Sequence, residues 1–172
     1  MFHIRVIFAS PNVIAWLRQR FNDLPIHRAC YHANNTQESL NVLSSLIEQD
    51  ARTLSVSDCM RMTPLHILCF KPTLTVAIIR VVGEGDYSVM TQTDLWGNTP
   101  LTAFWNARNF YEYEYDNRSR QEIISCLHYL LEVSSQVHNT SLVSYMTAAT
   151  MPIFRLDVVF QLAMNANLGR IF

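Results

Sequence analysis

The sequence predicts an all-α fold, a helical repeat solenoid with irregular capping helices, and three observations lead to it. Glycine is scarce, with four residues among 172, where an average composition gives about twelve. Rossmann domains, P-loop enzymes and tight-hairpin β-barrels depend on positive φ and need more glycine than this. A short segment recurs with its proline at positions 25, 64 and 100, which are 39 and 36 residues apart. Apolar residues at helical spacing follow each copy, as in repeat proteins.

Composition and charge limit the classes of partner. Apolar residues make up 49% of the chain and charged residues 16%, a balance that excludes a disordered chain. The 13 basic and 14 acidic residues give a net charge of −1. The arginines are scattered rather than gathered into a stripe, so we expect no nucleic-acid partner.

The same sequence predicts the compartment. No run of about 18 apolar residues occurs, so we expect no membrane partner. Residues 1–9 are apolar, but Arg5 interrupts them and no cleavage site for a signal peptide follows. The four cysteines lack the spacing of a disulfide framework, and we expect them to be reduced. We therefore expect a cytoplasmic location, with the nucleus as the alternative.

The N-terminal element is predicted to be a cap on the stack. Ser10 and Pro11 form a helix start, and Val13, Trp16 and Leu17 then share one face. We assign residues 1–21 to this N-terminal segment and capping helix.

Three helix pairs are predicted next, over about 22–57, 58–93 and 94–133. A proline begins the short first helix of each pair, where its missing N–H has no partner to lose. Thr63 and Thr99 precede two of these prolines and are suitable N-caps.

The second helix of each pair follows from its apolar residues. Leu43 and Ile47 lie on one face of a helix predicted from Thr36 to Gln49, and residues 74–82 are apolar almost all round. After an insertion over 107–118, the capping box at 119–122 opens a third helix. Residues 134–172 are expected to form a degenerate C-terminal capping repeat.

Residues 94–101 read Asp-Leu-Trp-Gly-Asn-Thr-Pro-Leu and residues 63–66 read Thr-Pro-Leu-His. These segments resemble the ankyrin repeat. The resemblance implies stacked helix–turn–helix units in which the histidine ties the turn to the stack. Arg61 and Asn22 stand where the family has its turn glycine, and a left-handed conformation costs energy for arginine. The implied structural residues are Pro25, His27, Thr63, Pro64, His66, Asp94, Gly97, Thr99 and Pro100.

The resemblance also implies a non-catalytic module that binds a protein partner through its turn tips and first helices. Trp96 is the leading candidate, although it could instead pack across the neighbouring tip. The insertion carries alternating tyrosines and acids, and it is either a partner contact or a solvated loop. The candidate contact residues are Tyr31, Met60, Met62, Phe70, Lys71, Leu95, Trp96, Asn98, Asn106, Tyr111, Tyr113 and Tyr115.

Two alternatives stay open. A structural or regulatory spacer would pack against further domains of a longer parent chain through apolar ends at 2–8 and 171–172. His27-x-x-Cys30 and His66-x-x-Cys69 have spacings that suit a zinc-binding protein or a thiol enzyme. Both pairs fall at the same phase of the repeat, however, which explains their spacing without a metal. We expect no catalytic residue, no cofactor and no metal.

Overall fold

The computed structural model describes residues 20–21, 23–71, 74–109 and 117–137, with side chains for all of these except 108–109 and 117–120. The regular structure within these ranges is entirely helical, which confirms the predicted all-α class. The expected N-terminal cap, the insertion tyrosines Tyr111, Tyr113 and Tyr115, and most of the C-terminal capping segment lie outside the described residues.

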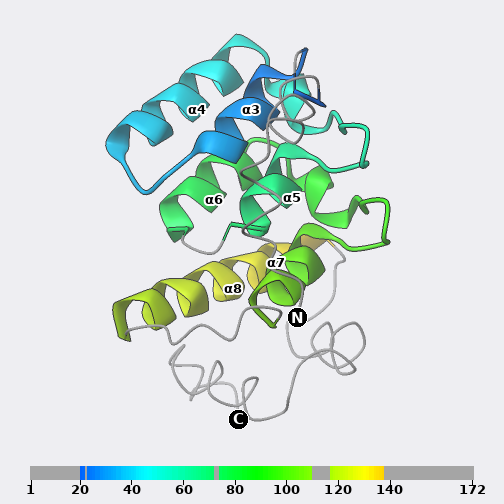
Figure 1. The fold of residues 1–172 in the computed structure, drawn as a ribbon. Helices are drawn as coiled ribbons and strands as arrows, with labels where there is room; N and C mark the ends of the chain where they lie inside the picture. Colours follow the sequence, from blue (N-terminus) through cyan, green and yellow to red (C-terminus); the bar gives the residue numbers. More distant parts are fainter. Residues whose placement is uncertain (1–19, 22, 72–73, 110–116, 138–172) are drawn as a thin grey trace, which may run out of the picture.

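The described helices form three consecutive pairs arranged in two layers (Figure 1). One layer, which we call the first-helix layer, contains α3, α5 and α7, and the second-helix layer contains α4, α6 and α8. Each helix contacts its partner in the pair and the next helix in its own layer. The bounds are α3 Pro25–His32, α4 Gln37–Gln49, α5 Pro64–Cys69, α6 Val76–Gly83, α7 Pro100–Asn109 and α8 Asn117–Val137, with 3₁₀ helices η1 Ala51–Leu54 and η2 Tyr87–Thr91.

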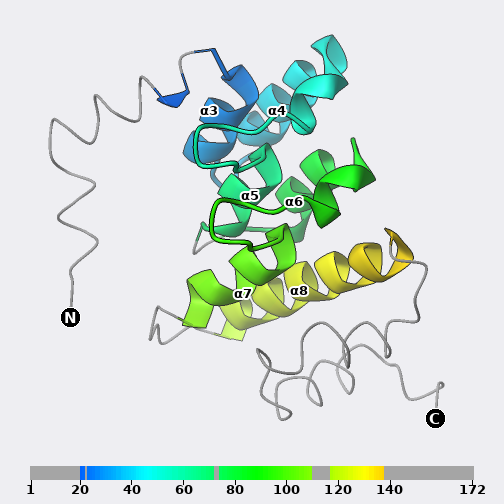
Figure 2. The same ribbon diagram turned by 90° about the vertical axis from the view of Figure 1, so that its right-hand side faces the viewer.

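The first-helix layer begins as the sequence predicts. Pro25, Pro64 and Pro100 are each the first residue of their helix. The hydroxyl of Thr63 accepts a hydrogen bond from the backbone N–H of His66 at 3.4 Å, so it caps α5. The turns that precede α5 and α7 project from the same side of the stack, one below the other (Figure 2).

The second-helix layer agrees with prediction except at the insertion. The helix expected over 36–49 is α4, and Thr36 is its N-cap. Around the insertion, α7 continues to Asn109 and α8 already begins at Asn117, two residues before the predicted capping box. The predicted bounds of the insertion, 107–118, are therefore wrong, since α7 and α8 extend into its two ends.

The last helix also passes the expected end of the third unit. We placed that end after residue 133, but α8 continues to Val137. Val133, Ser134 and Ser135 are all buried, so the helix extends past the predicted boundary with its side chains packed.

The core lies between the two layers and between successive pairs. Its fully buried large side chains come from every described α-helix, and they include Ile26, Leu43, Leu65, Leu68, Ile78, Ile79, Leu101, Phe104 and Leu130.

Two of the glycines are explained by packing. A Cβ on Gly83, the last residue of α6, would lie 2.8 Å from the Tyr129 hydroxyl oxygen and 3.0 Å from Met90 Cε. A Cβ on Gly85 would overlap Leu54 Cδ1. The close approach of neighbouring side chains therefore explains glycine at both positions.

Candidate protein-binding surface

The turns before α5 and α7 share one design. Asp58 Oδ1 accepts hydrogen bonds from the backbone N–H groups of Met60 and Met62, at 2.8 and 2.9 Å. Asp94 Oδ1 makes the equivalent bonds, two and four residues further along, at 2.9 and 2.8 Å. A backbone bond from each aspartate N–H closes its turn, at 3.0 and 2.9 Å. Each turn is therefore held by its own aspartate.

In the tip of each turn, the third residue after the aspartate has a left-handed backbone. Arg61 has a φ of 57° and Gly97 a φ of 81°, the positive values among the described residues. This agrees with the expectation that Arg61 stands in place of a turn glycine. The two tips are also joined directly, because Leu95 N–H donates to the Met60 carbonyl at 3.0 Å.

The joined tips present apolar side chains to solvent. Leu95 is 56% exposed and Trp96 is 63% exposed. Trp96 therefore does not bury itself against the neighbouring tip, which was the alternative left open by the sequence. Cys59 and Arg61 are exposed as well, and Met60 is half-buried. We call this set, Cys59, Met60, Arg61, Leu95 and Trp96, the tip surface.

Two buried histidines fix the turns to the helices. His66 Nε2 donates to the Asn98 carbonyl at 2.9 Å, and His66 Nδ1 lies 2.8 Å from the Thr63 hydroxyl. His27 Nε2 donates to the Met62 carbonyl at 3.2 Å. Each histidine thus binds the turn of the next helix pair. Burial lowers the pKa of both imidazoles, so the neutral form is favoured.

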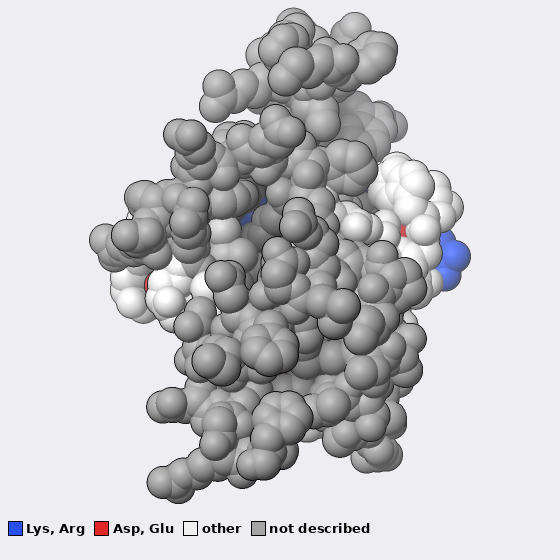
Figure 3. All heavy atoms as spheres, turned by 90° about the horizontal axis from the view of Figure 1, so that it is seen from below, with Lys and Arg blue, Asp and Glu red and all other residues white. Residues whose placement is uncertain are grey.

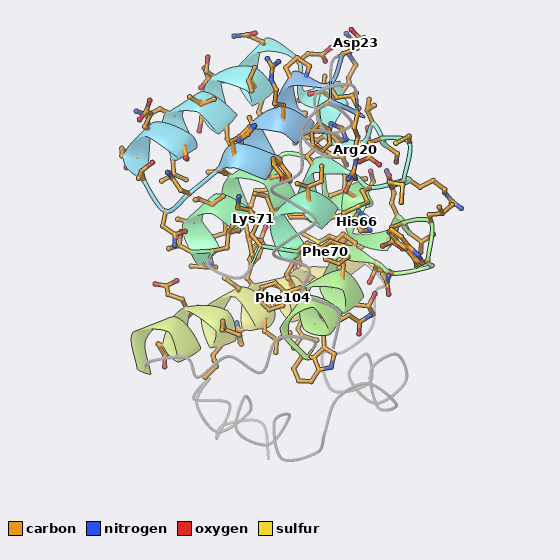
Figure 4. The ribbon with its side chains drawn as sticks, in the orientation of Figure 1. Arg20, Asp23, His66, Phe70, Lys71 and Phe104 are labelled. Carbon is orange, nitrogen blue, oxygen red and sulfur yellow. The ribbon has the colours of Figure 1, made fainter. Side chains whose placement is uncertain are left out.

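The first-helix layer contributes further candidate residues, which are half-buried. Lys71 Nζ donates to the Tyr31 carbonyl at 2.6 Å, and burial lowers the pKa of Lys71. Phe70 and Lys71 follow directly after α5, and Figure 4 shows Phe70 between α5 and α7. Asn106 donates to the Asn98 side chain at 3.0 Å. These candidate residues therefore already connect neighbouring helices, and only part of each faces solvent.

Met62 does not belong to this surface. It is 7% exposed, and its sulfur accepts a hydrogen bond from Arg20 Nη2 at 3.1 Å. Its prediction as a partner contact is wrong because the tip turns its side chain inward. Cys59 and Arg61, which the turn brings to the surface, take part in its place.

Arg20 is a structural residue of the Asp58 turn that the sequence did not predict. Its Nε donates to Asp58 Oδ2 at 2.7 Å, its Nη2 also binds that oxygen, and the side chains are almost wholly buried (Figure 4). In the other turn, Asn98 Nδ2 donates to Asp94 Oδ2 at 3.1 Å. Met62 occupies the position in the Asp58 turn that Asn98 occupies in the Asp94 turn, but methionine has no hydrogen-bond donor. The second oxygen of Asp58 therefore needs a donor from elsewhere in the chain, and this was the sequence signal for a residue such as Arg20.

Among the described side chains, no group of three His, Cys, Asp or Glu residues is placed to hold a metal ion. No described helix combines the length and apolar character needed to cross a bilayer. Seen from below, the visible atoms of described residues are mainly uncharged (Figure 3).

Comparison with known proteins gives no match among protein-family models, curated proteins or solved structures. The candidate surface therefore rests on its own geometry. Two turns carry it, each is held by a buried aspartate, and both display exposed side chains on one side of the stack.

Proposed function

We propose that the chain is a divergent member of the ankyrin repeat family, with about three repeats over residues 22–133. Three features support this assignment: helix pairs stacked in two layers, turns with matching aspartate bonds, and histidines that bind the next turn. The departures are local, since Leu24 replaces the capping threonine and Arg61 replaces the turn glycine.

The function we propose is non-catalytic recognition of a protein partner by the tip surface, with the half-buried Tyr31, Phe70 and Asn106 as further contacts. The observation that carries it is the exposure of Trp96 and Leu95 on a turn that is already rigid. Exposed tryptophan is a frequent centre of binding energy at protein interfaces. A rigid turn loses little conformational entropy on binding, so more of the burial energy of these side chains contributes to affinity.

The compartment we propose is the cytoplasm or the nucleus. All four cysteines are described, and Cys30, Cys69 and Cys126 are buried. Buried cysteine thiols are typical of proteins in reducing compartments. The proposed partner is a protein, with no role for nucleic acid, membrane, metal or cofactor.

Affinity capture with matched variants tests this function. Wild type, Trp96→Ala and Tyr87→Ala are used side by side, because Tyr87 is an aromatic residue with 49% exposure on η2, outside the tip surface. We expect a partner that wild type and Tyr87→Ala retain and that Trp96→Ala loses.

Equal capture by all three variants would contradict the proposed surface. If no partner is captured and the wild-type chain self-associates instead, the spacer function becomes the better account. The oligomeric state of wild type, measured by light scattering, separates these two results.

A further inference from the structure

We propose that the tip surface binds a partner segment that has a carboxylate beside an apolar side chain, and that Arg61 binds the carboxylate. Trp96 and Leu95 would take the apolar side chain. This inference rests on the proposed function and adds the chemistry of the partner. Four observations on the two tips carry it.

The first observation is that Arg61 occupies its position at a cost. Its φ of 57° is left-handed, a conformation that is unfavourable for a residue with a Cβ. Gly97 holds the equivalent place in the next turn at φ 81° without that cost. Strained residues that persist on a surface are often functional, so the side chain of Arg61 needs an explanation.

The second observation is that the guanidinium of Arg61 makes no polar interaction with the described residues that would stabilise the fold. Within the described chain, the guanidinium of Arg61 has no hydrogen bond or ion pair, and the residue is exposed. Two other arginines differ from it, since Arg20 binds the buried Asp58 and Arg52 binds Asp50. Folding therefore does not explain an arginine at this place.

The third observation is the charge of the tip surface. Its five residues include one cation, Arg61, and no acid. The nearby carboxylates of Asp58 and Asp94 are buried, and the backbone N–H groups of the turns occupy them. Arg20 also neutralises Asp58. The charge offered to a partner at this place is therefore positive, and its complement is a carboxylate.

The fourth observation places the cation beside the apolar residues. Because Leu95 N–H binds the Met60 carbonyl at 3.0 Å, the tip that carries Arg61 lies directly against the tip that carries Trp96. A guanidinium binds a carboxylate through two parallel hydrogen bonds, which gives geometric selectivity as well as charge. A peptide segment with an acid next to an aromatic or aliphatic residue can contact both tips at once, with its acid on Arg61 and its apolar side chain on Trp96.

The test is selection from a phage-displayed library of random 12-residue peptides against three immobilised proteins: wild type, Arg61→Glu and Trp96→Ala. Glutamate keeps the backbone cost of arginine, so Arg61→Glu isolates the charge, and thermal unfolding checks that all three fold. We expect wild type to enrich peptides with Asp or Glu beside an apolar residue. We expect Arg61→Glu to enrich Lys or Arg instead.

A synthetic peptide from the wild-type selection then gives the effect in solution. We expect its Kd to rise about tenfold for Arg61→Gly and more for Trp96→Ala. Peptides that need Trp96 but show no excess of acid would overturn this inference and leave the proposed function intact. If no selected peptide depends on Trp96, both are overturned.

Discussion

His27 and His66 occupy equivalent positions, but they differ in one hydrogen bond. Nδ1 of His66 lies against the Thr63 hydroxyl, at 2.8 Å. Nδ1 of His27 is buried and has no hydrogen-bond partner among the described residues. Leu24 stands in the place of the threonine, and α3 accordingly has no side-chain cap. A buried acceptor without a donor costs stability, so this position is a weak point of the first helix pair.

Leu24→Thr is expected to correct this weakness. Compared with Leu24→Val, which has the same shape without the hydroxyl, the threonine variant should be more stable by about 1 kcal/mol. The hydroxyl would cap α3 and supply a donor to His27. Urea unfolding of the two variants measures the difference, and equal midpoints would show that the missing bond has no cost.

Arg61→Gly is expected to stabilise the fold by about 1 kcal/mol, because glycine adopts positive φ without a steric cost. Arg61→Ala keeps the Cβ and should bring no such gain. Thermal unfolding of both variants, with Gly97→Ala as the reverse change, checks this expectation. A gain in the alanine variant equal to that of glycine would mean that the charge, not the backbone, determines the effect.

Single residues were predictable where a local rule fixes them. Pro64 and Thr63 follow from the requirements of a helix start, and the cost at Arg61 follows from its place in the turn. Arg20 was not predicted, since its bond to Asp58 spans 38 residues of sequence. Met62 also contacts that distant partner through its sulfur.

At the scale of elements, the contact between α6 and α8 is close at Gly83. The Tyr129 ring packs there, and its hydroxyl is buried without a hydrogen-bond partner among the described residues. Arg80 lies over the same ring, 5.2 Å from its centroid. A larger residue at position 83 must therefore displace a well-packed aromatic side chain.

Gly83→Ala is expected to destabilise the protein by about 1–2 kcal/mol, because the new Cβ would overlap the Tyr129 hydroxyl. Tyr129→Phe alone should cost little, since the hydroxyl it removes is unpaired. In the Tyr129→Phe background the cost of Gly83→Ala should fall by about 1 kcal/mol. A double-mutant cycle by urea unfolding measures this coupling, and strictly additive costs would contradict the close contact.

Elements were predictable where cap and periodicity agree. The helix over 36–49 has Thr36 at its start and a regular apolar face, and α4 is found there. The ends of α7 and α8 were less well predicted, because several polar residues near the insertion are compatible with either a loop or a helical turn. Local preference alone did not decide these ends.

At the scale of the whole molecule, the two buried histidines link stability to pH. Burial lowers the pKa of His27 and of His66 below the value of about 6.5 that an unfolded histidine has. Between the folded pKa and pH 6.5 the unfolded chain therefore binds more protons than the folded chain. Stability is complete above about pH 6.5 and falls as the pH is lowered through this range.

We expect the urea midpoint to be constant from pH 8 to 7 and to fall as the pH is lowered below about 6.5. Each histidine contributes at most about 1.4 kcal/mol per pH unit. His66→Gln should reduce the slope, because it removes one of the two groups while its amide can still donate to Asn98. A slope that is unchanged in this variant would assign the pH dependence to other residues.

The pattern of recurring prolines predicted the layered arrangement of helix pairs, because each pair needs a neighbour to bury its apolar face. The surface was less predictable. Trp96 and Met62 both looked like tip residues in the sequence, and only the packing of the turns separates the exposed residue from the buried one.

The central claim, that the tip surface binds a protein partner, is tested most directly at Cys59. Cys59 is the exposed cysteine of the chain, whereas Cys30, Cys69 and Cys126 are buried. The rate of its alkylation by N-ethylmaleimide therefore reports on the tip surface in the native protein. With the captured partner present, we predict that alkylation slows in proportion to the fraction of chain bound. An unchanged rate when the partner is fully bound would contradict the claim.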